Sequence, residues 1–313
     1  MSENKSMLYM YVETPLHAGT GRTLGAVDLP IQRERTTGYP IIQASGVKGS
    51  LRAETAPPVM DKGDWLTVFG PEQGSTDEGK TSADFGGALF IGDARILLFP
   101  VRSLAGVFAW VTSEDVLQRF EREMKIADQR FSSGLPKRDA NDSSAWVTEP
   151  SNLVVNNGQV VLEEYAFDVA SNTDAKKKVT EFAGWLASNA FPKNGYTYWT
   201  DKLKTNLCIL SDEDFCDFVK YSTEVQTHIA LNPDKKVVTG KALWTSESLP
   251  VDTLLYAPVV TTSARKLEDK RDEKEVMKLF RDAVGKLPNK QMQMGGDETT
   301  GQGMVTLRLG GES

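Results

Sequence analysis

The chain has very few of the side chains that bind soft metals or form disulfides. Only two cysteines, Cys208 and Cys216, and two histidines, His17 and His228, occur in 313 residues. Two cysteines are too few for a disulfide framework, and the four residues show no zinc-finger or zinc-ribbon spacing. These absences indicate a cytoplasmic protein and predict that any bound metal is a hard cation held by carboxylates, such as Mg²⁺ or Mn²⁺.

Long apolar runs and an excess of basic residues are missing as well. No stretch approaches the roughly 20 apolar residues that a membrane-spanning helix needs, and the first residues lack the pattern of a signal peptide. We therefore expect no membrane contact. The 36 basic and 43 acidic residues give a net charge of −7. This balance argues against broad, non-specific binding of nucleic acid and leaves only a local basic patch for that role.

The most informative stretch is residues 14–52, where a long loop precedes a helix. Glycines and prolines recur up to residue 40, so one regular element is not expected there. A loop of this length in a compact domain is usually functional or disordered, and apolar residues such as Val27 and Ile31 argue against disorder. The loop presents His17 and a lone carboxylate, Asp28.

The helix after this loop has the features of a phosphate-binding corner. Ser45 is predicted to cap its start, where free backbone amides attract anions. Lys48 and Arg52 are four residues apart and therefore share one face of the helix, with Gly49 beside them.

The rest of the chain is predicted to combine strands with amphipathic helices. Short apolar and β-branched runs predict strands, and an Asn-Gly turn at residues 157–158 predicts a hairpin over 153–167. Residues 223–231 are expected to form a strand that places Glu224 and His228 on one face. Helices are expected to start at Ser113, Thr173 and Ser211 and to cover residues 268–287.

A glycine-rich loop over residues 295–303 precedes the last predicted strand. Gly295, Gly296 and Gly301 let the backbone approach a ligand closely. The loop has no P-loop lysine and opens no helix, so alone it is a weak signal of phosphate binding.

Four segments together resemble the RAMP superfamily. They are HAGTGRTLGAVDLPIQRERTTGYPIIQASGVKGSLR (17–52), GDARILLFPVRSLAGVFAWVT (92–112), TEVQTHIALNPDKKVVTGKALWTSESLP (223–250) and MQMGGDETTGQGMVTL (292–307). More narrowly, they are similar to the repeated backbone subunit, subunit four, of type III-B (Cmr) CRISPR effector complexes. The match extends from end to end of the chain, and its motifs are specific.

The resemblance implies a single α+β domain over residues 1–313. Its fold would be a ferredoxin-like (RRM-like) palm with an inserted hairpin, or thumb, and peripheral helices. The palm is expected mainly from residues 1–60, 85–125 and 215–313, with insertions at 61–84 and 127–210. Either the 153–167 hairpin or the acidic segment 61–84 is a candidate for the thumb.

The resemblance also implies an activity and a set of partners. Such a subunit binds guide RNA and cleaves complementary target RNA with a loop aspartate that aligns with Asp28, and Glu224 aligns with an acidic residue near that loop. The expected partners are guide RNA, target RNA, copies of the chain in a helical filament, and other subunits of the complex. RNA contacts are expected at Ser45, Lys48, Gly49, Arg52, Arg33, Gly295, Gly296 and Gly301.

RNA carries its own nucleophile, the 2′-hydroxyl, so a cleaving subunit needs mainly to hold geometry and assist proton transfer. Asp28 can act as the base or hold a weakly bound Mg²⁺ or Mn²⁺, His17 can act as the acid, and Glu224 can complete a metal shell. The alternatives are a scaffold subunit that binds RNA without cutting it, and an unrelated enzyme with a phosphate site at Ser45–Arg52.

Overall fold

The structure, a computed structural model, describes residues 3–23, 25–71, 85–127, 129–131, 133–135, 137–138, 142–231, 235 and 238–311. The strands are β1 (Glu3–Val12), β2 (Ile41–Ile42), β3 (Leu89–Ile91), β4 (Ala94–Arg102), β5 (Phe108–Ser113), β6 (Trp146–Val147), β7 (Val154–Val155), β8 (Gln159–Leu162), β9 (Tyr165–Asp168), β10 (Leu207–Leu210), β11 (Glu224–Leu231), β12 (Val238–Ser248), β13 (Leu254–Thr262), β14 (Gln291–Gln293) and β15 (Met304–Leu309). The α-helices are α1 (Ala44–Glu54), α2 (Lys62–Phe69), α3 (Glu114–Ile126), α4 (Thr173–Asn189), α5 (Thr197–Asn206), α6 (Asp212–Tyr221) and α7 (Glu273–Lys286). Two 3₁₀ turns, η1 (Pro288–Lys290) and η2 (Glu298–Thr300), flank β14.

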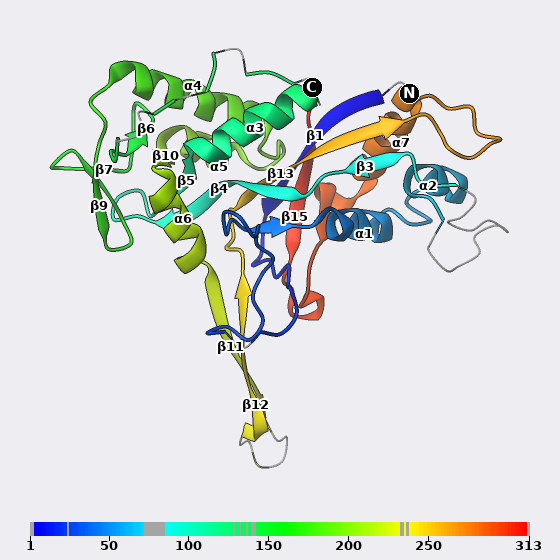
Figure 1. The fold of residues 1–313 in the computed structure, drawn as a ribbon, viewed down its shortest axis with the longest axis horizontal. Helices are drawn as coiled ribbons and strands as arrows, with labels where there is room; N and C mark the ends of the chain where they lie inside the picture. Colours follow the sequence, from blue (N-terminus) through cyan, green and yellow to red (C-terminus); the bar gives the residue numbers. More distant parts are fainter. Residues whose placement is uncertain are drawn as a thin grey trace.

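One ten-stranded sheet forms the centre of the molecule (Figure 1). Its order is β14-β15-β1-β13-β4-β5-β10-β6, with β2 and β3 joined at the side to β4 and β13. The central part, β15-β1-β13-β4, is antiparallel throughout, with α1 following β1 and α7 following β13. Taken alone, β1, α1, β4, β13, α7 and β15 follow the βαββαβ succession of a ferredoxin-like unit, with the other elements inserted between them. The α+β class expected from the sequence is therefore confirmed.

Strand β1 lies in the middle of the core. Met7 to Val12 are all buried, without the alternation that one solvent-exposed face would give. Tyr9 meets Phe120 of α3 at a ring-centroid distance of 6.3 Å, while α7 packs against β1 and β13. The first apolar run of the chain is thus read correctly as a strand, and its continuous burial explains its composition.

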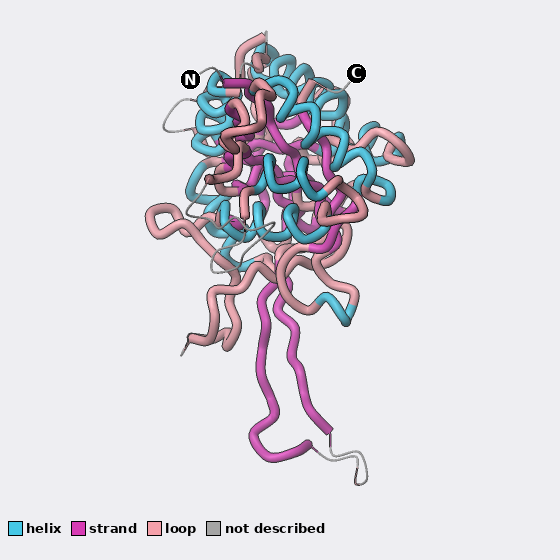
Figure 2. The backbone as a smooth tube through the Cα atoms, turned by 90° about the vertical axis from the view of Figure 1, so that its right-hand side faces the viewer, coloured by secondary structure: helices cyan, strands magenta, loops and turns pink. Residues whose placement is uncertain are grey.

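A long two-stranded hairpin, β11–β12, projects from the body of the molecule (Figures 1 and 2). The structure does not show the 153–167 hairpin as a projecting element. That segment forms β7, β8 and most of β9 in a separate three-stranded sheet, where Val160 and Leu162 are fully buried and Phe167 packs against Phe218 of α6. Of the other thumb candidate, 61–84, residues 72–84 lie outside the described residues.

Several helix boundaries follow the sequence signals. The Ser211 hydroxyl accepts the Asp214 N–H at 3.1 Å and caps α6. The predicted helix at 268–287 starts later, at Glu273, because Asp272 and Glu275 form a reciprocal capping box there. Strands β6 and β10, from the segment 127–210, extend the main sheet.

In the described part of the chain, every helix is too short or too polar to cross a lipid bilayer.

Candidate functional site

A groove of about 380 Å³ opens beside the first turns of α1. Three segments far apart in the sequence line it: the start of the long loop, one side of α1, and the start of the glycine-rich loop. The lining residues are His17, Ala18, Gly19, Gly21, Gln32, Ile42, Gly46, Ser50, Met294, Gly295 and Gly296. The structure therefore brings together the loop histidine, the helix start and the terminal glycines that sequence analysis singled out separately.

The glycines allow the backbone to pack directly on His17. A Cβ atom on Gly295, whose φ is +89°, would lie 2.5 Å from the His17 carbonyl oxygen, and one on Gly19 would lie 2.5 Å from the His17 Nε2 atom. Gly296 N–H donates to the His17 carbonyl at 2.9 Å. Gly301, also predicted to contact RNA, sits at φ +80° in open space. The glycine-rich loop does make a close backbone approach, and its partner at Gly295 and Gly296 is the backbone of His17.

The His17 ring is held by strand β12. Its Nδ1 donates to the Glu247 carbonyl oxygen at 2.6 Å. This bond fixes the tautomer with the Nδ1 proton and leaves Nε2 as the ring nitrogen that can exchange a proton with a ligand.

The start of α1 differs from the sequence prediction. Gln43, not Ser45, is the N-cap residue, and it makes no side-chain capping bond. The Asp93 carboxylate instead accepts the Ala44 N–H at 2.8 Å. Ser45 is therefore the second residue of the helix and is exposed to solvent. The prediction that it caps the helix was wrong. A carboxylate from a distant loop took the capping role, which no local pattern could reveal.

Lys48 and Arg52 lie on the opposite side of α1 from the groove. Gly46 and Ser50 line the groove. Lys48 is two positions from both of them and Arg52 is two positions from Ser50, and a step of two positions turns about 200° around a helix. Lys48 Nζ donates to the Leu89 carbonyl oxygen at 2.7 Å, and Arg52 stacks over the Trp65 ring, 3.8 Å from its centroid. Burial, with Arg52 and Arg265 nearby, lowers the pKa of the Lys48 ammonium.

Asp28 lies at the root of the projecting hairpin, outside the residues that line the groove. Its Oδ2 accepts the Thr245 backbone N–H at 2.8 Å and the Thr245 hydroxyl at 3.0 Å. The Asp28 N–H donates to the same hydroxyl at 3.0 Å. The two bonds that reach Oδ2 lower the pKa of the Asp28 carboxyl, so the group is ionised at neutral pH.

Glu224 lies on the other face of the same hairpin. It pairs with Ser248, and facing residues of an antiparallel pair share a face. Thr245, which Asp28 contacts, is an odd number of residues from Ser248 and points to the opposite face. As predicted, β11 places Glu224 and His228 on one face, but that face is not the Asp28 face. Burial raises the pKa of the Glu224 carboxyl.

Arg33 is engaged within the protein. Its guanidinium donates to the Val219 carbonyl at 2.9 Å and pairs with the Glu247 carboxylate. Glu247 Oε2 also accepts the Ile31 N–H at 3.0 Å. Arg33 and Glu247 therefore join the long loop to α6 and β12.

No three His, Cys, Asp or Glu side chains converge to hold a metal ion within the described ranges of the chain. Asp28 and Glu224 lie on opposite faces of the hairpin, and His17 already uses Nδ1. A cation held by protein groups alone does not fit this donor set. A cation shared between Asp28 and RNA oxygens does, because Mg²⁺ commonly binds through one or two carboxylates plus substrate phosphates.

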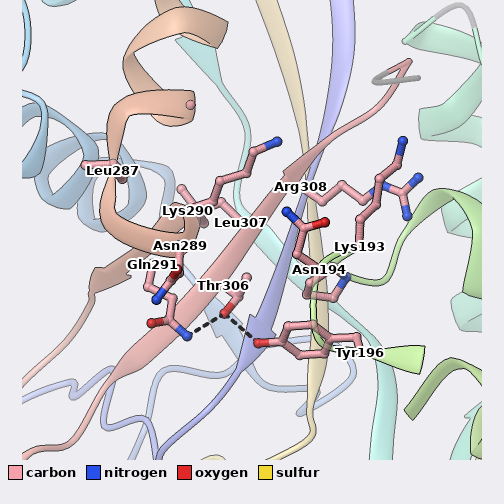
Figure 3. Close-up of a pocket in the computed structure, with 12 residues that line it drawn as sticks. Lys193, Asn194, Tyr196, Leu287, Asn289, Lys290, Gln291, Thr306, Leu307 and Arg308 are labelled. Atoms are coloured by element: carbon pink, nitrogen blue, oxygen red, sulfur yellow. Dashed lines mark hydrogen bonds between the residues drawn. The ribbon is translucent and has the colours of Figure 1, made fainter. Parts of the chain in front are cut away.

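Another cavity lies away from this groove, over β15 (Figure 3). It has a volume of about 690 Å³, and one wall is residues 192–196, the other residues 287–291. The Thr306 hydroxyl links its two walls, accepting Gln291 Nε2 at 3.2 Å and lying 3.0 Å from the Tyr196 hydroxyl. It contains none of the predicted site residues.

Sequence reasoning missed Thr245, Glu247 and Asp93, which hold the predicted residues in place. Thr245 and Glu247 lie in a run of four polar residues, 245–248, that carries no recognisable site motif. Their roles depend on pairing with a loop more than 200 residues earlier in the chain, so only the tertiary structure reveals them.

The fold and the groove define a class of protein. The sequence profile of the RAMP superfamily matches residues 9–306, and the chain belongs to this superfamily. Its relatives within the superfamily are more specific. The chain is 35% identical over 302 residues to the CRISPR system Cmr endoribonuclease Cmr4 of Pyrococcus furiosus, covering 96% of this chain and 94% of that protein. It is 24% identical over 312 residues to the CRISPR system CMR subunit Cmr4 of Saccharolobus solfataricus, covering 94% and 93%.

Solved structures agree with this placement. The crystal structure of oligomeric Cmr4 from Pyrococcus furiosus superposes with a TM-score of 0.72 at 29% identity, covering 99% of this chain and 100% of that one. A chain in the cryo-EM structure of the type III-B Cmr-beta complex bound to cognate target RNA matches with a TM-score of 0.70 at 19% identity, covering 97% and 96%. At that identity the second match shows the shared fold only.

Proposed function

We propose that this chain is the repeated backbone subunit of a type III-B CRISPR effector complex, and that it binds guide RNA and cleaves complementary target RNA. The end-to-end similarity to the Pyrococcus furiosus endoribonuclease supports the class of activity. The observation that carries the proposal is Asp28, an ionised carboxylate on a long loop, oriented by Thr245 at the root of a projecting hairpin.

In this proposal the guide RNA lies along the groove between α1 and the glycine-rich loop. Ser45, Gly46 and Gly49 are exposed on that part of α1, and Gly295 and Gly296 form the facing wall. Glycine has no side chain, so the protein backbone at these positions can approach a ribose–phosphate chain directly.

Lys48, Arg52 and Arg33 have a different part in the proposal. Each donates to a backbone carbonyl of the protein, at Leu89, Gly70 and Val219. They therefore fix the elements that build the groove, and they add positive charge near the RNA, where electrostatic attraction acts over about 8–10 Å.

Target cleavage requires the 2′-hydroxyl to line up with the neighbouring phosphate. We assign Asp28 to accept or orient the hydroxyl proton, and His17, in its doubly protonated imidazolium form, to donate the Nε2 proton to a phosphate or leaving oxygen. The β12 residues that hold Asp28 and His17 are Thr245 and Glu247, two positions apart and thus about 7 Å along the strand. Glu224 stays a separate prediction, because it faces the other side of the hairpin.

A divalent cation, Mg²⁺ or Mn²⁺, would be held weakly by Asp28 together with RNA oxygens and would lower the pKa of the attacking hydroxyl. Asp28 keeps its charge at neutral pH because of the Thr245 bonds, and so can serve as a ligand without first losing a proton.

The test is Asp28→Asn in guide-loaded complexes offered a complementary labelled RNA. We expect cleavage to fall by at least about 100-fold, because the charge at the reacting centre is lost, while RNA binding and assembly stay unchanged. Asp252→Asn is the matched control, since Asp252 is a partly buried carboxylate that accepts a hydrogen bond from the Tyr11 hydroxyl, away from the groove. Cleavage at the normal rate by Asp28→Asn would show that this residue is not the catalytic one.

The second candidate is a scaffold subunit that binds RNA without cutting it. The similarity to a protein named only as a subunit is compatible with this role. Complexes of the unaltered chain that never cut a matched target with Mg²⁺ or Mn²⁺ present would favour the scaffold.

A further inference from the structure

The loop that carries Asp28 is attached to the projecting hairpin as an additional short strand. Leu29 pairs in parallel with Ser246 of β12. The Leu29 N–H donates to the Thr245 carbonyl at 3.0 Å, and the Glu247 N–H donates to the Leu29 carbonyl at 2.9 Å. The cleavage loop and the hairpin are therefore one hydrogen-bonded unit at this point.

Within that unit, the Thr245 hydroxyl contacts both the backbone and the carboxylate of Asp28. It accepts the Asp28 N–H at 3.0 Å and donates to Asp28 Oδ2 at 3.0 Å. One hydroxyl can do both, because it carries one donor and two acceptor lone pairs. The Thr245 N–H and hydroxyl both donate to Asp28 Oδ2. Thr245 therefore fixes the orientation of the carboxylate through this one oxygen.

A second attachment lies two residues further along β12. The Glu247 side chain, which is 8% exposed, binds the Ile31 N–H through Oε2 and the Thr223 hydroxyl through Oε1 at 2.8 Å. The Glu247 carbonyl accepts the His17 ring N–H. Residues 245–247 thus hold the loop at both of its proposed catalytic side chains, and any shift of this part of β12 moves them together.

The outer part of the hairpin is much less tightly packed. On the face that carries Thr245, Ile229 and Leu243 in this outer part are 52% and 61% exposed. Few contacts oppose a movement of this part, so a strand that binds beside it can displace it at low energetic cost.

We propose that Thr245 is a positioning residue that makes cleavage depend on the position of the hairpin. The carboxylate of Asp28 takes its orientation from Thr245, and Thr245 moves with β12. Binding of a target strand against the hairpin therefore sets the carboxylate in line or takes it out of line. This inference rests on the proposed endoribonuclease function and assigns that site its regulation.

The experiment compares Thr245→Val, which keeps the shape and removes the hydroxyl, with Thr245→Ser, which keeps the hydroxyl. Thr227→Val is the matched control, because Thr227 faces Thr245 across the hairpin on the same face. In guide-loaded complexes we expect Thr245→Val to lower the single-turnover cleavage rate by about 10- to 100-fold at unchanged target affinity. Thr245→Ser and Thr227→Val should cut within about threefold of the unaltered chain.

Amide hydrogen exchange at Asp28 gives a readout that does not depend on activity. The Asp28 N–H should exchange faster in Thr245→Val, which has no acceptor for it, and at the normal rate in Thr245→Ser. Normal cleavage by Thr245→Val would overturn the inference, and so would a serine variant as slow as the valine variant. Normal cleavage by Asp28→Asn would instead overturn the proposed function beneath it.

Discussion

Gly295 shows at the scale of one residue why the glycine-rich loop has its composition. Its φ of +89° and the 2.5 Å from its would-be Cβ to the His17 carbonyl oxygen both exclude a larger side chain. Gly49 provides the contrast. It lies in α1 without a positive φ, and a Cβ atom added there would have no neighbouring atom within 4 Å.

The two glycines should respond in opposite directions to replacement by alanine. Gly295→Ala should lower the free energy of unfolding by about 2 kcal/mol or more, since a left-handed backbone and a backbone clash are both imposed. Gly49→Ala should raise it by roughly 0.5–1 kcal/mol, as expected for a glycine in a helix. Chemical denaturation of the purified proteins measures both values. Equal stability of the two variants would contradict the packing role of Gly295.

Gly49→Ala also distinguishes an effect on stability from an effect on RNA binding. If Gly49 contacts RNA through a close backbone approach, Gly49→Ala weakens guide binding in spite of its higher stability. Guide affinity, measured by fluorescence anisotropy at fixed salt, gives the answer, with Gly184→Ala in α4 as a second helix-interior control. Unchanged affinity would remove Gly49 from the predicted RNA contacts.

Sequence patterns single out some residues and leave the orientation of others undetermined. Asp28 and His17 stand out in the sequence because a charged or titratable group in a glycine-rich loop has few structural explanations. The direction in which Lys48 and Arg52 point depends on which side of α1 meets β3 and α2, and spacing along a helix does not decide that.

At the scale of elements, α2 is clasped to the segment before α7 by charged groups. Arg271 binds the carboxylates of Asp64 and Asp269, and the Thr67 hydroxyl donates to Asp269 at 2.6 Å. Hydrogen bonds from Arg271 are the main reason that the pKa of the Asp269 carboxyl is well below its usual value. These contacts attach the charged run 266–272 to α2 just before α7 begins.

This arrangement predicts how stability depends on pH. A carboxyl whose pKa is lowered by folding stabilises the folded state above its unfolded pKa of about 3.9, and that contribution is lost as the pH falls below it. Asp269→Asn should therefore lower the melting temperature by a few degrees at pH 7 and have a smaller effect at pH 3. Thermal melts across that range, with Asp282→Asn on the outer side of α7 as control, test the sign. An equal effect at both pH values would contradict it.

The hairpin β11–β12 carries a prediction about its two faces. Glu224→Gln should change target cleavage by less than about threefold if the reacting phosphate lies on the Asp28 face. The measurement is the single-turnover rate in the assembled complex. A loss as large as that of Asp28→Asn would instead show that both faces act on the target and would restore Glu224 to the catalytic set.

Elements were predictable where local patterns suffice. The Asn-Gly turn gave the β7–β8 hairpin, and Ser211 with its acidic neighbours marked the start of α6. The choice of which hairpin projects was not predictable, because it depends on whether a strand finds a surface to pack on. Leu162 finds one, whereas Ile229 and Leu243 do not.

At the scale of the whole molecule, an acidic chain is proposed to line a strand of RNA. The net charge of −7 means that its RNA contacts are local and that copies repel one another weakly at a distance. A subunit repeated along a guide must contact the next copy through two different surfaces, in an arrangement that propagates instead of closing.

The last prediction follows from this arrangement. With guide RNAs of increasing length, the mass of the complex should rise in steps of one 34.5 kDa chain, and without RNA the assemblies should be smaller or of mixed size. Mass photometry resolves the steps. A closed oligomer whose size ignores the length of the guide would contradict a filament built on RNA.

The ten-stranded sheet ends in very short strands, β14 with three residues and β6 with two. A strand at the border of a sheet presents unpaired backbone N–H and C=O groups, to which another polypeptide can add as a further strand. Border strands this short present very few such groups. Copies of the chain can therefore crowd along a shared strand at high local concentration without merging their sheets into fibrils. Contacts between copies are therefore expected away from these two borders of the sheet.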